Sequence, residues 1–452
     1  MRKSAIVIVL FAGLCALLPN TMLNGALSQS ALAESFDIEA ATADYLSVVS
    51  PEEEANTNGY VNAGYKIMVI SVIFEIVVAL ALLQFGFARR WRELAERVTR
   101  VRVLQSFIFV PIYVVVTAII GLPLAWYSGF VVEHKYGLSN LDLGSWFNEH
   151  LISMGFSLVA LTIFLTIAYM VIRATKERWW MWGSGLMIMG IMISIFLGPL
   201  YIDPAFNEYR PMDEGPLKER ILSIARANGM EADDVKQVDA SKQTKRVSAN
   251  VSGLFGSSRI ALNDNLIIRT SPDGVEAVMA HEIGHFVLSH IWKMMAMFAV
   301  LFFLGFAFVG SLFNRLVKRH GGRWGVRDVD DLAGLPLLLA AISVLFFITT
   351  PFQNRITYIN EVSADLFAIN ATQNPDAWAE VALLTAEYRK LRPSAWEENW
   401  LNHHPSPYAR IHMAMVWKAE QVGKTQPSSS LLLQPEDNLP EDETPPSGDG
   451  GE

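Results

Sequence analysis

Cysteine and charge are both scarce in this sequence, and each scarcity excludes a class of protein. Cys15 is the only cysteine in 452 residues, which excludes a disulfide framework and a zinc site built from cysteine. Any bound metal must therefore be held by His, Asp or Glu. Charged residues make up 18% of the chain and hydrophobic residues 52%, whereas soluble domains are about a quarter charged. This balance predicts an integral-membrane protein that is surrounded by a lipid bilayer.

Clustered basic charge is also missing. The formal net charge is −9, and Lys and Arg gather only in short loops between apolar runs. Domains that bind nucleic acid usually carry a basic patch or stripe. We therefore expect no nucleic-acid partner.

The start of the chain is typical of a secretory signal. Arg2 and Lys3 precede an apolar run at 5–18, and small residues follow as far as Ala33. Because the run is short for a membrane span, we predict a signal peptide at 1–33, with an uncleaved signal anchor as the alternative. Residues 34–65 form an acidic segment without Lys or Arg, and the acidic tail 425–452 is expected to be disordered.

Six further apolar runs are long enough to cross the bilayer as helices. They lie at about 66–88, 104–128, 151–172, 180–200, 292–313 and 332–351. This pattern predicts a mainly α-helical, polytopic membrane bundle, with four spans in 66–201 and two in 291–351. The polar segments 202–290 and 352–424 remain outside the bilayer and are expected to form the two parts of one catalytic unit.

Short-loop charge predicts the orientation of these spans, since cytoplasmic loops are rich in Lys and Arg. Three loops are rich in Lys and Arg and together contain fourteen of them: 89–103, 173–179 and 314–331. The two alternate segments, 34–65 and 129–150, together contain only one. The three basic loops fall on one side by parity. We therefore expect them in the cytoplasm and the polar segments outside.

Local patterns within 202–290 predict a β-hairpin followed by a helix. Segments 245–254 and 258–262 alternate around Phe255-Gly256-Ser257, which indicates the hairpin. The helix begins at Ser271 or at Asp273, and no breaker separates it from the next span.

That helix carries His281-Glu282-Ile283-Gly284-His285. Residues four apart share one helical face, so both histidines can bind the same ion. Glu282 lies beside them and is not required as a ligand. Two imidazoles that hold zinc next to a free carboxylate are the groups needed for hydrolysis by a zinc-activated water, with Glu282 as general base.

A catalytic zinc site needs a third protein ligand and one open position. The extended motif that supplies a histidine at position 291 is absent, since Ile291 stands there. His290 is five residues beyond His285 and is expected to point elsewhere. Glu361 is the better candidate, because the last span returns the chain to the side of His281, and we expect Glu361 to begin a helix directly after that span.

These features together resemble the type-I CAAX prenyl protease family, gluzincin membrane peptidases that include the HtpX-like proteases. The resemblance covers about 66–415 and is carried by the zinc motif and by the stretches 121–138, 259–264, 361–368 and 404–411. It implies a helical bundle around a large chamber, Glu361 as third zinc ligand, and Asp365 as the partner that orients a zinc-binding histidine.

The resemblance also places His404 and Arg410 at the cleft, where they would stabilise the transition state. Alternatively, His404 is an exposed turn residue before a proline, and Arg410 pairs with a helix carboxylate. Glu75 lies inside an apolar run and should face the bundle interior rather than lipid.

We conclude from the sequence that the protein is a membrane-embedded zinc metalloendopeptidase with one Zn²⁺ per chain and a peptide or protein substrate. The expected setting is a bacterial inner membrane, with the active site facing the periplasm and a role in envelope protein processing or quality control. The alternatives are a non-proteolytic quality-control module with structural zinc and a transporter. An intact Glu282 disfavours the first, and the scarcity of ionisable residues within the spans disfavours the second.

Overall fold

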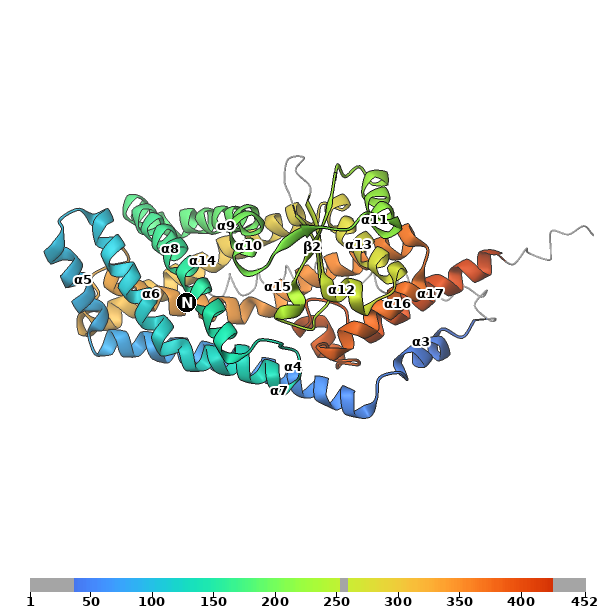
Figure 1. Ribbon diagram of the computed structural model, residues 1–452. Coiled ribbons are helices and arrows are strands. Elements are labelled where there is room, and N and C mark those ends of the chain that lie inside the picture. Colours follow the sequence, from blue (N-terminus) through green and yellow to red (C-terminus); the bar gives the residue numbers. More distant parts are fainter. Residues whose placement is uncertain (1–35, 253–258, 426–452) are drawn as a thin grey trace, which may run out of the picture.

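The computed structural model describes residues 36–252 and 259–425. The signal segment predicted at 1–33 and the acidic tail predicted from 425 onward therefore lie outside the described residues, except for Thr425. Within the described parts the chain forms a long helical bundle at one end and a helix-covered sheet at the other (Figure 1).

The six predicted apolar runs all lie in long helices. These helices are α4 (Pro51–Gln84), α6 (Arg102–Trp126), α8 (Leu143–Thr175), α9 (Trp179–Leu197), α14 (His290–Trp324) and α15 (Leu335–Thr372). By length and composition, five helical stretches could cross a membrane, and one of them, Leu143–Phe206, contains both α8 and α9. A 3-10 turn at Lys176–Arg178 separates these two helices.

Two helix boundaries differ from the prediction. Helix α4 begins at Pro51, where Ser50 and Glu53 form a capping box, so the second half of the acidic segment belongs to this helix. Glu361 does not begin a helix, because α15 runs unbroken from Leu335 to Thr372. Pro351 lies inside α15, and a proline does not end a helix whose neighbours hold the flanking turns in place.

The three basic loops meet at one end of the bundle. Arg92 Nη1 lies 2.7 Å from Asp331 Oδ2, and Arg173 Nη1 donates a 3.0 Å hydrogen bond to the carbonyl of Arg102. Arg327 adds an ion pair to Glu96 on α5 (Phe87–Val98). The parity inferred from loop charge is therefore matched by direct contacts between the loops.

The sheet has four strands in the order β1-β2-β4-β3. The strands are β1 (Tyr209–Pro211), β2 (Val235–Val238), β3 (Ala249–Ser252) and β4 (Arg259–Asn263). Strands β3 and β4 are antiparallel with Val251 opposite Ile260, which confirms the predicted hairpin, although its tip at 253–258 lies outside the described residues. Strands β1 and β2 were not predicted from the sequence, because they are too short to show a clear alternating pattern.

Shorter helices enclose the sheet and the helix α13 (Pro272–Val287). Ile221, Ile260 and Met279 represent an apolar core shared by α11, the sheet and α13, and Figure 1 shows α11 and α13 beside the strands. A second core joins α13 to α3, α16 and α17. The shorter helices are α3 (Ile38–Leu46), α7 (Glu133–Lys135), α10 (Asp203–Phe206), α11 (Pro216–Ala227), α12 (Asp264–Arg269), α16 (Pro375–Leu384) and α17 (Pro407–Thr425).

A cavity of about 930 Å³ lies between α4, α6, α8 and α15. Glu75 lines it together with His150 and several hydroxyl side chains, so Glu75 faces the bundle interior as its cost in lipid requires. The cavity runs along α15 as far as Thr350, on the same helix as Glu361.

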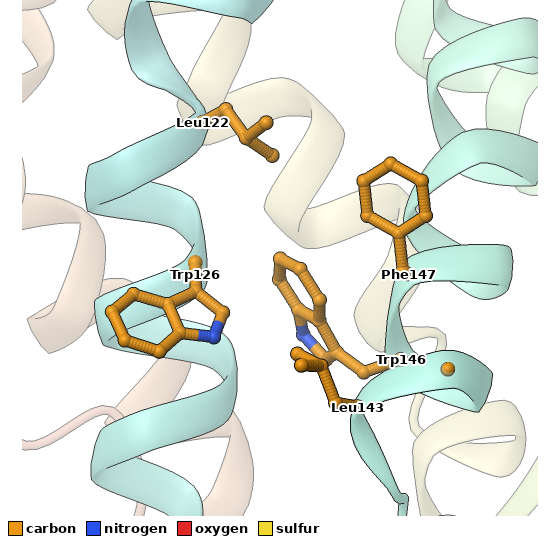
Figure 2. A pocket seen from close by; sticks show the side chains of 6 residues that line it. Leu122, Trp126, Leu143, Trp146 and Phe147 are labelled. Carbon is orange, nitrogen blue, oxygen red and sulfur yellow. The ribbon is translucent and has the colours of Figure 1, made fainter.

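A second cavity, of about 430 Å³, lies between the end of α6 and the start of α8. Figure 2 shows Trp126 from α6 facing Trp146 and Phe147 from α8 across it. Its lining contains no titratable side chain. Tryptophans at this position are typical of the boundary between lipid and water, and the pocket has none of the groups needed for catalysis.

Candidate metal centre

Helix α13, which carries the HExxH motif, is fixed at its first turn. Ser271 is the N-cap, and its hydroxyl accepts a hydrogen bond from the backbone N–H of Gly274. The same hydroxyl donates a 2.8 Å hydrogen bond to Glu380 on α16. Of the two predicted starts, the structure therefore has the one at Ser271, and the cap ties the helix to its neighbour.

Helices α13 and α15 approach closely at Gly284. A Cβ added to Gly284 would lie 2.9 Å from Cδ1 and 3.2 Å from Cβ of Phe367 on α15. Only glycine fits such a separation without displacing a neighbour. This close approach brings Glu361, two turns before Phe367, up to the histidines of α13.

The structure brings His281, His285 and Glu361 into one cluster. His281 Nε2 and His285 Nε2 lie 3.1 Å apart. His281 Nε2 lies 3.3 Å from Glu361 Oε2, and His285 Nε2 lies 3.5 Å from Glu361 Oε1. With one atom taken from each residue, the three ligand atoms lie within 4.8 Å of one another. Two ligand atoms on a tetrahedral zinc with bonds of 2.0–2.1 Å are about 3.4 Å apart, so the close approach of the three side chains and the donor set fit zinc.

Asp365 lies one turn after Glu361 and is fully buried. Its Oδ1 is 2.8 Å from His281 Nδ1, the ring nitrogen that faces away from the cluster. Its Oδ2 is 3.0 Å from Arg410 Nε. The carboxylate therefore holds the orientation of His281, as such partners of metal ligands do, while Arg410 compensates its buried charge.

Trp378 on α16 closes this side of the centre. Its ring stacks on His281 at a centroid distance of 5.3 Å and an angle of 20°. Arg410 also lies over the Trp378 ring, at 5.3 Å from its centroid. A role for Trp378 could not be predicted from the sequence, because nothing in its local sequence indicates that it packs against α13.

The two histidines of the motif have opposite pKa shifts. Burial by itself lowers the pKa of His281, but the carboxylates of Asp365 and Glu361 outweigh burial and raise it to about 9. Burial and the charge of His281 lower the pKa of His285 to about 4. At neutral pH, a metal ion that binds here therefore has to displace a proton from His281, whereas His285 is already neutral.

Glu282 lies next to His281 on α13, and burial raises the pKa of its carboxyl group to about 7. In the described part of the chain, its carboxylate forms no hydrogen bond and no ion pair with another side chain. A carboxyl group that is free of partners and has a pKa near neutrality is suited to accept and return a proton at physiological pH.

His404 and Arg410 both lie beside Glu361. His404 Nδ1 is 2.6 Å from Glu361 Oε2, and the His404 side chain keeps a quarter of its surface exposed. Arg410 is buried, and its Nη2 is 3.5 Å from the same oxygen. Arg410 thus pairs with helix carboxylates, which was the alternative considered for it, whereas His404 is neither fully exposed nor remote from the centre.

His290 also contacts the centre, although it is not one of the three clustered groups. Its Nδ1 lies 2.9 Å from His285 Nδ1. An unbroken helix, as predicted from the sequence, would carry His290 away from His285. The structure instead ends α13 at Val287 and begins α14 at His290.

Two family models match consecutive parts of this chain. A model of the CAAX prenyl protease N-terminal region, with five membrane helices, matches residues 39–208, and the model of peptidase family M48 matches residues 211–418. The second match contains all the groups of the candidate metal centre. The chain belongs to peptidase family M48. It is therefore a membrane-embedded zinc metalloendopeptidase.

Relatives of this M48 peptidase occur in bacteria and eukaryotes. It is 28% identical over 379 residues to the uncharacterized metalloprotease YhfN of Bacillus subtilis, covering 83% of this chain and 89% of that protein. It is 30% identical over 285 residues to the CAAX prenyl protease 1 homolog of Dictyostelium discoideum, covering 61% of this chain and 66% of that protein.

The fold is similar to the crystal structure of S. mikatae Ste24p. The TM-score is 0.68 at 21% sequence identity, and the similarity covers 83% of this chain and 95% of that chain. Membrane helices and the metallopeptidase part together therefore follow one known architecture.

Proposed function

We propose that this M48 peptidase cleaves peptide bonds at a single zinc ion held by His281, His285 and Glu361, with Glu282 as general base. The observation that carries the proposal is the separation of the three ligand groups, 3.1–3.5 Å. The buried carboxyl group of Glu282 lies next to them, and within residues 36–252 and 259–425 it has no hydrogen-bond or ion-pair partner. A bound zinc ion supplies a Lewis acid that polarises the scissile carbonyl and acidifies the attacking water.

The residues of the chain then move the protons. Glu282 accepts a proton from the attacking water as the new C–O bond forms at the carbonyl carbon, and it returns that proton to the amine nitrogen as the C–N bond breaks. We assign His404, at the edge of the centre, the donation of a hydrogen bond to the developing oxyanion. Because its Nδ1 faces Glu361 Oε2, the donor in this role is Nε2, which requires a proton on both ring nitrogens. Arg410 acts mainly behind the ligands, through its pairing with Asp365 and Glu361.

We infer a bacterial envelope setting with the active site facing the cell exterior or periplasm. Support comes from the three basic loops, which meet at the end of the bundle away from the metal centre, since such loops favour the cytoplasm. Relatives are named CAAX prenyl proteases, but an outward-facing site favours exported or misfolded proteins over prenylated ones as substrates.

The test compares two matched substitutions on helix α13 in the full-length protein. Glu282→Gln should reduce cleavage of an unstructured reporter peptide by at least about 100-fold, the usual contribution of general base catalysis, while zinc stays near one per chain. Glu276→Gln, on the same helix but paired with Arg220, should leave both unchanged.

Two outcomes would contradict the proposal. If Glu282→Gln keeps wild-type cleavage, Glu282 is not the base. If the wild-type protein holds zinc but cleaves no peptide, the structural-zinc module is the better description.

A further inference from the structure

The connection between α13 and α14 contains an unusual backbone conformation. Ser289 has φ +56° and ψ +37°, in the left-handed region, although it is not glycine. Such residues are uncommon and mark places where the surrounding structure imposes the conformation. A left-handed residue is a common way to end a helix, usually as glycine, and Ser289 follows the C-cap Leu288 of the HExxH helix.

The break at Ser289 changes where His290 points. In a continuous helix, a residue five positions after His285 would lie about 140° around the axis from it. Because the helix is interrupted, His290 turns back toward α13 instead. It is 2% exposed, and its ring lies edge to face with the His285 ring at a centroid distance of 4.9 Å.

Both ring nitrogens of His290 have partners. Nδ1 is 2.9 Å from His285 Nδ1, and Nε2 is 3.2 Å from the Ser363 hydroxyl on α15. That hydroxyl is in turn 2.9 Å from the carbonyl of Asn360 and 3.0 Å from that of Ile359. An unbroken chain of contacts therefore runs from His285 to the backbone of α15, within one turn of Glu361.

The chemistry of these groups assigns a direction to each hydrogen bond. The Nε2 atom of His285 faces the cluster, so a metal ion there requires its lone pair, and the proton must be on Nδ1. His285 then donates to His290 Nδ1, which must be an acceptor. His290 consequently carries its proton on Nε2 and donates to Ser363, whose hydroxyl donates to a backbone carbonyl. Every donor meets an acceptor.

We propose that His290 is a positioning residue for the metal centre, which fixes the tautomer and ring orientation of His285 through a neutral relay ending at Ser363. The inference rests on the proposed assignment of His285 as a metal ligand. The centre is then asymmetric, since His281 is oriented by the carboxylate of Asp365 and His285 by an imidazole. His290 is also the first residue of membrane helix α14, so the relay connects that span to the metal.

The experiment measures zinc affinity by chelator competition on the full-length protein in detergent. His290→Ala should weaken zinc binding by roughly 10–100-fold, as loss of an orienting partner does. His290→Gln should recover part of this loss, because its side-chain oxygen can accept from His285 Nδ1. Ser363→Ala should cost less than His290→Ala, since the bond between the two histidines remains.

Two further readouts separate positioning from a general structural role. The Co²⁺-substituted His290→Ala protein should show an altered visible absorption spectrum, because the His285 ring is no longer held. The melting temperature of the metal-free His290→Ala protein should stay near that of the metal-free wild type. His150→Ala, which removes a histidine that stacks on Trp146, should change neither the affinity nor the spectrum.

Wild-type zinc affinity in His290→Ala would overturn the proposal. It would also be overturned if His290→Gln lost as much zinc affinity as His290→Ala and the metal-free variants were destabilised. His285→Ala serves as the reference in the same assay and should lose zinc almost completely. If His285→Ala keeps zinc, the ligand assignment itself fails, and this inference fails with it.

Discussion

Asp365 illustrates how single residues determine the properties of the metal centre. Its carboxylate is fully buried between His281 and Arg410, and both of its oxygens lie within 3.0 Å of a nitrogen. A buried charge of this kind is stable only while its partners remain, because removing one partner leaves the other uncompensated. Because Asp365 contacts both His281 and Arg410 of α17, metal binding by His281 is coupled to the packing of α17.

Substitution of Asp365 should weaken metal binding and also destabilise the fold, since Arg410 stays buried. Asp365→Asn keeps an oxygen for His281 but loses the charge that balances Arg410, and we expect zinc affinity to fall by about 10–100-fold. The zinc affinity of Glu361→Ala, which lacks a proposed ligand, should fall further. We expect less than about one tenth of its sites to be occupied at the same zinc concentration. Chelator competition measures both values. Similar affinities for the two variants would contradict the distinction between ligand and supporting residue.

At the scale of elements, the centre depends on how closely α13 and α15 approach. The ligands come from two helices, and no local interaction fixes the distance between them. Gly284 permits the approach, since even a methyl group there would meet Phe367 at 2.9 Å. The other end of α13 is also closely packed. Gly274 lies against Thr270 and Val381, and the Ser271 cap donates a hydrogen bond to Glu380.

Gly284→Ala should therefore destabilise the protein. Alanine favours a helix over glycine by about 1 kcal/mol, but overpacking of a close contact costs about 1–3 kcal/mol, and Phe367 cannot move its own Cβ. The difference between these two terms predicts a net loss of up to about 2 kcal/mol in the free energy of unfolding, measured by denaturant titration in detergent with chelator present.

Gly322→Ala is the matched control for this change. Gly322 lies in the last turn of α14, and a Cβ added there meets nothing within 4 Å. It should be neutral or slightly stabilising. A Gly284→Ala protein as stable as the Gly322→Ala protein would show that the two helices can separate without cost.

At the scale of the whole molecule, charge and metal are placed at opposite ends. The basic loops form one end of the bundle, where Arg92, Arg173 and Arg327 bind neighbouring loops. The proposed zinc ligands lie at the other end, beside the sheet. A single orientation in the bilayer therefore decides which compartment receives the active site.

Cysteine labelling tests the proposed orientation. In a background with Cys15→Ser, Ser223→Cys on the exposed side of α11 should react with a membrane-impermeant maleimide in intact cells whose outer layer is permeable. Ala174→Cys, an exposed position at the basic end, should react only after lysis. The reverse pattern would place the active site in the cytoplasm and would leave the metal chemistry untouched.

The sequence by itself determined the features that depend on neighbours along the chain. Six apolar runs predicted six helices, the alternating pattern before Arg259 predicted the β3–β4 hairpin, and the spacing of His281 and His285 placed both rings on one helical face. Each of these follows from periodicity within a few turns or residues.

Tertiary structure decided the contacts between distant segments. Helix packing decides three features of the centre. They are the position of Glu361 within an unbroken α15, the pairing of Arg410 with Asp365, and the stacking of Trp378 on His281. The break at Ser289 also belongs here, because serine seldom adopts the left-handed conformation and the local sequence does not predict it. Spacing in the sequence suggested which residues bind the metal, and only the packed helices could show which residues hold those ligands in place.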